Sequence, residues 1–278
     1  MNAEFNADLP WIIIGYGRVG QALSLLADQL DIEVIGTWNR THQAAEAAVV
    51  PSNVQFYGEL HTTLQPLFDE ARLIWLTVVD DAIANCFQAI SESIYPGSVV
   101  VHTSGSQPST ILQTEADLAV ASLHPLQAIS DPYTAVQRFS QCHWTVEGDD
   151  RAVDVLTQLV EPAGIVPIRI PREQKVLYHA SAVTAANLLV SLFDAAISMA
   201  READIDSQTA RKMLVELGRS SLENLADLPP SRALTGPAAR GDIAVIERHR
   251  RALKDCDDPS LLEIYELLTQ RALDRLAE

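Results

Sequence analysis

Three glycines near the N-terminus have the spacing of a loop that binds phosphate groups. They lie in the segment IIIGYGRVGQAL, between a β-branched apolar run and an apolar-periodic stretch. In a G-x-G-x-x-G loop, the first glycine makes a tight turn, the second admits a pyrophosphate, and the third lets the helix pack on the strand. The helix N-terminus then faces the anion. We predict a dinucleotide site, with a turn that holds no ligand as the alternative. Its predicted contacts are Gly15, Tyr16, Gly17, Arg18, Val19 and Gly20.

The end of the second expected strand indicates which dinucleotide would bind. A site for NAD places an acid about 20 residues after the loop, where it holds the ribose 2′-hydroxyl. Here stand Asn39, Arg40 and Thr41, and no acid lies between Val34 and Gln43. Arg40 could bind a 2′-phosphate through charge-assisted bonds of about 1.5–3 kcal/mol. The sequence therefore predicts NADP, with a solvated arginine at a helix start as the alternative.

The segment TVVDDAI follows the fourth expected strand. In an open α/β sheet, ligands bind outside the carboxyl ends of the strands. We therefore expect Val78 and Val79 to line the cofactor, and Asp80 or Asp81 to cap the next helix.

Two histidines stand at the ends of the next two expected strands. The segment VHTSGS places His102 and Ser104 on a turn, and SLHPLQ places His124 before Pro125. A histidine suits a proton donor, because its ordinary pKa near 6.5 is close to neutral pH. We predict His124 as the second choice for that donor and Ser104 as an orienting group, with hydrogen-bonded structural residues as the alternative.

The nearly uncharged stretch from Val176 to Ala200 predicts one buried helix with a polar stripe. At 100° per residue, His179, Asn187 and Asp194 fall within an arc of about 80°. His179 and Asn187 lie about 12 Å apart along the axis, so both cannot contact one small atom. We predict His179 as the first-choice proton donor and Asn187 as an orienting group. A polar seam between helices or subunits is the alternative.

Two further features of the sequence give weaker indications of a functional site. A metal site formed by His102, His124 and His179 would lack a carboxylate or cysteine at ligand spacing, so no metal is predicted. In the segment LTGPAARGD, Thr235 and Arg240 could reach a ligand from a turn.

The elements that must position these residues alternate over the first 170 residues. Such alternation of short β-rich runs and helix patterns favours a parallel sheet covered on both faces. The segments HWTVEG and GIVPIRI flank a helix pattern over 149–161 and predict one more pair of strands. Beyond Pro171 the strand signals stop, and the patterns over 172–201, 206–226, 241–256 and 259–277 predict helices. The six strands expected first are Trp11–Gly15, Ile32–Trp38, Val54–Tyr57, Arg72–Val78, Ser98–His102 and Leu118–Leu123.

Composition limits the partners of the chain. Its 278 residues carry a formal net charge of −17, and nucleic acids and anionic membranes need a basic surface. Three cysteines in no metal spacing predict reduced thiols and a cytoplasmic protein. The N-terminus carries no signal-peptide pattern. Polar residues within 176–193, with Asp194 directly after, argue against a membrane span.

The order of motifs resembles a known family. GYGRVG, LTVVDDAI, HTSGS, SLHPL, LYHASAVTAANLLVSL and LTGPAARGD follow one another as in bacterial Rossmann-like proteins with a C-terminal helical domain of unknown function. That family is similar to pyrroline-5-carboxylate reductase, ketopantoate reductase and the 6-phosphogluconate/β-hydroxyacid dehydrogenases. The resemblance implies a doubly wound parallel Rossmann sheet over residues 1–170. It also implies an all-α domain over 171–278, similar to the C-terminal domain of 6-phosphogluconate dehydrogenase, which would close the active site and form a homodimer.

Departures from these relatives leave the reaction open. The β-hydroxyacid enzymes carry a lysine followed by paired asparagines, whereas here Lys175 is followed by the single Asn187, twelve residues on. The leading hypothesis is an NADP(H)-dependent oxidoreductase that acts on a small carbonyl, imine or hydroxy compound. The alternative is a non-catalytic NADP-binding sensor or interaction protein.

Overall fold

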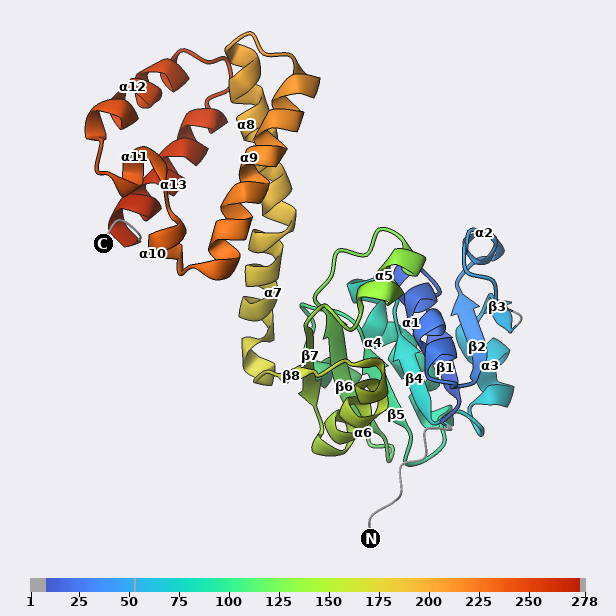
Figure 1. The fold of residues 1–278 in the computed structure, drawn as a ribbon. Helices are drawn as coiled ribbons and strands as arrows, with labels where there is room; N and C mark the ends of the chain where they lie inside the picture. The colour runs from blue at the N-terminus through green and yellow to red at the C-terminus, as the bar shows by residue number, and fades with distance from the viewer. Residues whose placement is uncertain (1–8, 53, 276–278) are drawn as a thin grey trace. The chain divides into compact units, whose positions relative to one another are not determined.

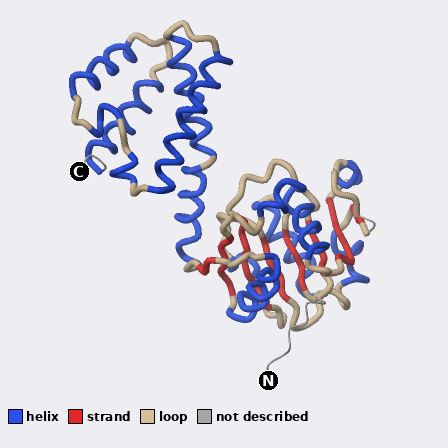
Figure 2. Tube along the Cα trace, in the orientation of Figure 1, coloured by secondary structure: helices blue, strands red, loops and turns tan. Residues whose placement is uncertain are grey.

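The computed structural model describes residues 9–52 and 54–275, which divide into two units. The first unit runs to Ala182 and the second begins at Val183. Figure 2 shows strands in the first unit and helices alone in the described part of the second. The predicted boundary after residue 170 lies earlier in the chain, because the first turn of helix α7 (Lys175–Ala185) is bonded to the sheet.

The first unit is built on one eight-stranded sheet in the order β3-β2-β1-β4-β5-β6-β7-β8. The first six of these strands are parallel, β7 runs antiparallel to β6, and β8 is parallel to β7. This order is the doubly wound Rossmann arrangement with two appended strands, as predicted. The strands are β1 (Trp11–Ile14), β2 (Val34–Asn39), β3 (Gln55–Tyr57), β4 (Leu73–Leu76), β5 (Val99–His102), β6 (Ala119–Pro125), β7 (Trp144–Gly148) and β8 (Ile168–Arg169).

Two apolar cores cover the two faces of this sheet. Successive residues of a strand point to opposite faces, so Trp11 and Ile13 enter one core while Ile12 and Ile14 enter the other. Helices α1 (Arg18–Gln29), α5 (Pro132–Arg138) and α6 (Asp150–Val160) supply the first core. Helices α3 (Leu60–Leu64) and α4 (Asp80–Ile90) supply the second. Figure 1 shows these helices around the sheet, with the short α2 (His42–Glu46) after β2. This double coverage explains why β1 and β4 are apolar throughout.

The second unit is helical and has a small core of its own around Ala195, Leu253 and Leu261. The side chain of Asp242 accepts a hydrogen bond from the backbone N–H of Val245 and caps α12. Its helices are α8 (Asn187–Glu202), α9 (Ser207–Asp227), α10 (Pro230–Ala233), α11 (Gly236–Ala239), α12 (Ile243–Lys254) and α13 (Ser260–Arg275).

The single buried helix predicted over 176–200 is wrong in two respects. The backbone leaves helical geometry at Ala186, so α7 and α8 are separate helices. They are also largely exposed within the chain: Lys175 is the buried residue of α7, and Ala195 that of α8. No proline or glycine marks the break in the sequence. The two helices pack on different neighbours, because α7 starts on the sheet and α8 packs on α9 and α13.

The segment Arg172–Glu202 is long and apolar enough to cross a membrane by length and composition alone. It is the one such segment among the described residues, and 6% of its most apolar 18-residue window is buried.

Candidate active site

The three glycines of the loop have the separate roles that their spacing predicts. Gly15 has φ +98°, and a Cβ added there would lie 2.6 Å from the backbone nitrogen of Val78. A Cβ added at Gly20 would lie 2.6 Å from the carbonyl oxygen of Gly15, so α1 packs closely on β1. A Cβ added at Gly17 would meet nothing within 4 Å. Gly15 therefore makes the tight turn, Gly17 leaves the approach open, and Gly20 allows the close packing.

A pocket of about 320 Å³ opens at the carboxyl ends of β1, β2 and β4. The predicted cofactor contacts that line it are Gly15, Gly17, Asn39, Arg40, Thr41, Val78 and Val79. The side chain of Tyr16 is instead buried in the core, 1% exposed. Tyr16 can therefore meet a nucleotide only through its backbone. Arg18, Val19 and Gly20 form the first turn of α1 beside the pocket.

The end of β2 offers a cation without a neighbouring acid. Arg40 is exposed and makes no ion pair within residues 9–52 and 54–275. None of the pocket-lining residues is acidic. Thr41 caps α2 by accepting a hydrogen bond from the backbone N–H of Ala44. An anionic group in this pocket would therefore meet Arg40 without competition from a carboxylate.

The first turn of α4 differs from the prediction. Val79 stands at the N-cap of α4, where no side chain caps the helix. Asp80 lies one position inside the helix and accepts a hydrogen bond of 2.6 Å from the hydroxyl of Ser106. The expected cap by Asp80 or Asp81 is therefore wrong, and Asp80 instead holds the turn that follows β5.

That turn is held by side-chain hydrogen bonds. The hydroxyl oxygen of Ser104 accepts hydrogen bonds from the backbone N–H groups of Ser106, at 3.2 Å, and Gln107, at 3.0 Å. The backbone N–H of Ser104 donates to Nδ1 of His102, which is fully buried. Ser104 and His102 therefore build the turn that carries Gly105, whereas Ser104 was predicted to orient a substrate.

His124 and His179 meet above Gly105. His124 lies at the end of β6 and His179 in the second turn of α7, with their ring centroids 6.0 Å apart. A Cβ added at Gly105 would lie 2.4 Å from Nδ1 of His179 and 2.9 Å from Nε2 of His124. The structure therefore brings together the two predicted proton donors, and only a glycine at position 105 leaves room for both rings. Asn187, the fourth predicted catalytic residue, begins α8 in the other unit and is exposed.

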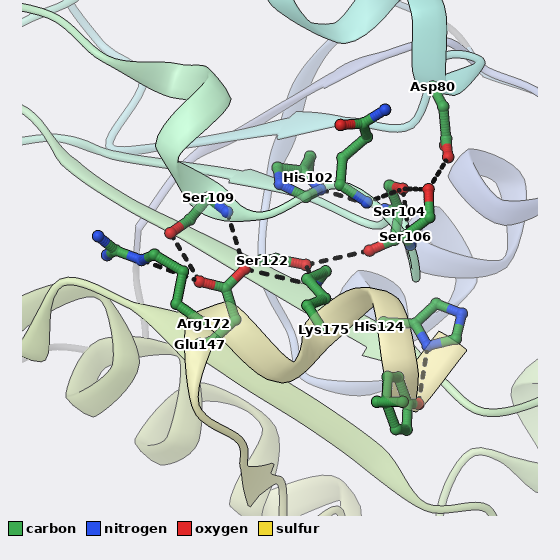
Figure 3. A network of polar contacts seen from close by, with 12 residues as sticks. Asp80, His102, Ser104, Ser106, Ser109, Ser122, His124, Glu147, Arg172 and Lys175 are labelled. Carbon is green, nitrogen blue, oxygen red and sulfur yellow. Dashed lines mark hydrogen bonds and ion pairs between the residues drawn. The ribbon is translucent and has the colours of Figure 1, made fainter. Parts of the chain in front are cut away.

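A buried ion pair, not predicted from the sequence, lies near His124 (Figure 3). Nζ of Lys175 lies 3.4 Å from a carboxylate oxygen of Glu147, and the two side chains are 1% and 2% exposed. Lys175 also donates to the hydroxyl of Ser122. Glu147 accepts from the backbone N–H and hydroxyl of Ser109, at 2.8 and 2.7 Å, and lies 3.4 Å from Nε of Arg172. The available signal was a lone charge in each of two apolar segments, WTVEG and KVLYHASAV.

This environment keeps two histidines neutral. Burial and the Lys175 cation lower the pKa of His102 to about 3. Burial, Lys175 and His179 lower the pKa of His124 to about 4, against a smaller opposite effect of Asp80. Burial also lowers the pKa of Lys175 itself, although Glu147 acts in the opposite direction. The ordinary pKa near 6.5 on which the sequence argument rests therefore does not apply to His124, whose ring is neutral at pH 7.

Within the described residues, no three histidine, cysteine or acidic side chains form a group that could hold a metal ion. The turn segment of LTGPAARGD lies in the second unit, where Thr235 precedes α11 and Arg240 follows it. Both residues are exposed.

Comparison with known proteins places both parts of the chain. Residues 5–125 match the family of Rossmann-like domains, and residues 142–272 match the family described as a domain of unknown function (DUF2520). No curated protein sequence matches the chain.

Solved structures share the fold at low sequence identity. A Bacteroides fragilis protein provisionally named an NADP oxidoreductase has a TM-score of 0.75 at 24% identity, over 97% of this chain and 99% of that one. A pyrroline-5-carboxylate reductase from Streptococcus pyogenes has a TM-score of 0.63 at 15% identity, over 97% and 100%. An NADH-preferring ketol-acid reductoisomerase from an uncultured archean has a TM-score of 0.65 at 14% identity, over 96% and 82%.

These matches confirm the resemblance seen in the sequence motifs and the predicted fold class. The nucleotide-binding fold is that of several oxidoreductases, whose names include both NADP and NADH. The chain is a Rossmann-like protein that carries the DUF2520 C-terminal domain.

Proposed function

We propose that this protein is an NADP(H)-dependent oxidoreductase acting on a small carbonyl, imine or hydroxy compound. The observation that carries the proposal is the pocket beside Gly15 and Gly17, which contains Arg40 and no acid. The open space at Gly17 fits a pyrophosphate, and Arg40 fits a 2′-phosphate. The names of the similar structures support a reductase, and two of them support NADP or a pyrroline substrate.

In this proposal the bound nucleotide supplies or accepts a hydride, and the chain supplies binding, orientation and a proton. Gly15 and Gly17 admit the pyrophosphate, and Arg40 holds the 2′-phosphate. His179 remains our choice for the group that exchanges a proton with the substrate. His124 has a different role, because a neutral imidazole can donate a hydrogen bond without giving up its proton. It would polarise the carbonyl or imine of the substrate.

Calorimetry with NADPH and NADH tests the cofactor assignment. We expect NADPH to bind roughly 10- to 100-fold more tightly, as a contact of about 1.5–3 kcal/mol implies. Arg40→Ala should remove that preference. Arg138→Ala is the matched control, since Arg138 is exposed on α5 and does not line the pocket. Equal affinities in the wild type, or an unchanged preference in Arg40→Ala, would overturn the assignment.

A second measurement separates an enzyme from a sensor. NADPH oxidation is followed over a panel of keto acids, imines and aldehydes, with the reverse reaction over hydroxy acids and cyclic amines. Turnover that is lost in His179→Ala while NADPH affinity stays within threefold supports the proposal. Tight NADPH binding with no turnover across the panel would favour the sensor.

We also propose that two copies associate through α8 and α9 of the second unit. Val190 and Leu217 are 70% and 65% exposed, and Leu188 and Leu222 are 53% and 50% exposed. Exposed apolar area of this extent is typical of a subunit interface. Helix α9 packs on α8 and carries charged residues along its length, which fits a protein partner better than lipid hydrocarbon.

A further inference from the structure

Two ring nitrogens lie beside Gly105, Nδ1 of His179 and Nε2 of His124. Nδ1 of His179 is buried and unpaired among the described residues. The hydrogen bond that the structure gives His124 is made by Nδ1, which leaves Nε2 open on the side of Gly105. Buried polar groups are nearly always satisfied, so an unpaired one indicates a missing partner. The two open nitrogens converge on one small region, next to the carboxyl ends of β5 and β6.

Tyr178 is the partner of the other nitrogen of His124. Its hydroxyl lies 3.0 Å from Nδ1, and the two rings meet edge to face with centroids 5.9 Å apart. A neutral imidazole has one N–H donor and one acceptor nitrogen. When the phenol donates to Nδ1, the ring proton must be on Nε2, the nitrogen that faces Gly105. Burial raises the pKa of Tyr178, so the phenol keeps the proton that it donates.

The buried ion pair sets the position of Tyr178. Lys175, Tyr178 and His179 are spaced i, i+3 and i+4, so they share one face of α7. Lys175 is held by Glu147 of β7 and Ser122 of β6. Ser122 and His124 point to the same face of β6, since they are two residues apart. The first turn of α7 is thereby fixed on β6, the strand that carries His124, and on the neighbouring strand β7.

We propose that Tyr178 is a positioning residue that places the proton of His124 on Nε2, and that Nε2 of His124 and Nδ1 of His179 together bind one heteroatom of the substrate above Gly105. This inference rests on the proposed function for the identity of that heteroatom, a carbonyl or hydroxyl oxygen or an imine nitrogen. Within it, Nε2–H of His124 donates to the heteroatom, and Nδ1 of His179 exchanges the proton.

Histidine nitrogen chemical shifts test the tautomer without any substrate or cofactor. Protein labelled with ¹⁵N-histidine is recorded at pH 7.5, with His124→Gln to assign the resonances. We expect wild-type His124 to carry its proton on Nε2. Loss of one hydrogen bond in Tyr178→Phe should change the ratio of the two tautomers by roughly three- to tenfold. Tyr133→Phe is the matched control, because its hydroxyl donates to the carbonyl oxygen of Val49, elsewhere in the same unit.

The outcomes separate this inference from the proposed function. A proton on Nδ1 in the wild type, or an unchanged tautomer ratio in Tyr178→Phe, would overturn the positioning role. If the panel yields a substrate, Tyr178→Phe should lower kcat roughly tenfold while the Kd for NADPH stays within twofold, and Tyr133→Phe should change neither. An equal kcat in Tyr178→Phe would overturn the role in turnover. A shifted tautomer without turnover by any variant supports the positioning of His124 and counts against the reductase.

Discussion

Lowering the pH from 7 to 5 should destabilise the first unit through His102 and His124. Both rings have a pKa near 6.5 in an unfolded chain, but about 3 and about 4 in the folded unit. At pH 5 the unfolded chain binds a proton at each ring that the folded unit does not bind. The free energy of unfolding therefore falls as the pH falls below 6.5. Each ring contributes a loss of about 2 kcal/mol, since about 1.5 pH units separate pH 5 from the unfolded pKa. The two rings together contribute about 4 kcal/mol.

Urea denaturation followed by tryptophan fluorescence measures this loss. The four tryptophans are Trp11, Trp38, Trp75 and Trp144, so the signal reports the first unit alone. In His124→Gln the loss between pH 7 and pH 5 should be about half that of the wild type, since one ring no longer takes up a proton.

The control is His249→Gln, which changes an exposed histidine of the second unit. Its denaturation curves should follow those of the wild type at both pH values. Equal stability of the wild type at pH 7 and pH 5 would refute the reasoning. A His124→Gln protein whose loss equals that of the wild type would show that His124 does not titrate below its ordinary pKa.

Three further outcomes are expected. Glu147→Gln should lower the free energy of unfolding of the first unit by about 3–5 kcal/mol in urea, because it leaves the Lys175 cation buried without its counter-charge. Glu161→Gln is the control, since Glu161 is exposed and forms no ion pair with any residue that the structure describes, and it should change this free energy by less than about 0.5 kcal/mol. Gly105→Ala should displace the rings of His124 and His179 and lower turnover roughly 100-fold. Calorimetry should still find the affinity for NADPH within threefold of the wild type. Ordinary turnover would mean that the two rings do not meet above Gly105. Light scattering at micromolar concentration should give the mass of a dimer for the wild type and of a monomer for Leu217→Glu on α9. A monomeric wild type that floats with lipid vesicles would favour a membrane, instead of a second copy, as the partner of this surface.

The sequence by itself determined the parts that depend on local pattern. The alternation of apolar runs and helix patterns predicts every strand of the sheet, because the periodicity that distinguishes a strand from a helix is visible within a few residues. The glycine spacing was enough to predict the conformation of the loop, because Gly15 and Gly20 are required by the backbone atoms close to them. Arg40 could be identified as a candidate contact for the cofactor, because it lies twenty residues after Gly20 in the sequence. The histidines at the ends of β5 and β6 could be expected at one edge, as parallel strands end on the same side.

Only the tertiary structure decided the charge and packing of the candidate site. Lys175 and Glu147 are 28 residues apart in the chain, and they form a pair because α7 begins across β6 and β7. Burial beside that pair, which no local pattern contains, lowers the pKa of His124 and keeps its ring neutral at pH 7. Gly105 lies in a serine-rich turn that shows no need for glycine until two rings from other elements pack on it. The break at Ala186 has the same origin, since α7 and α8 are held by different neighbours while the sequence between them remains a good helix former.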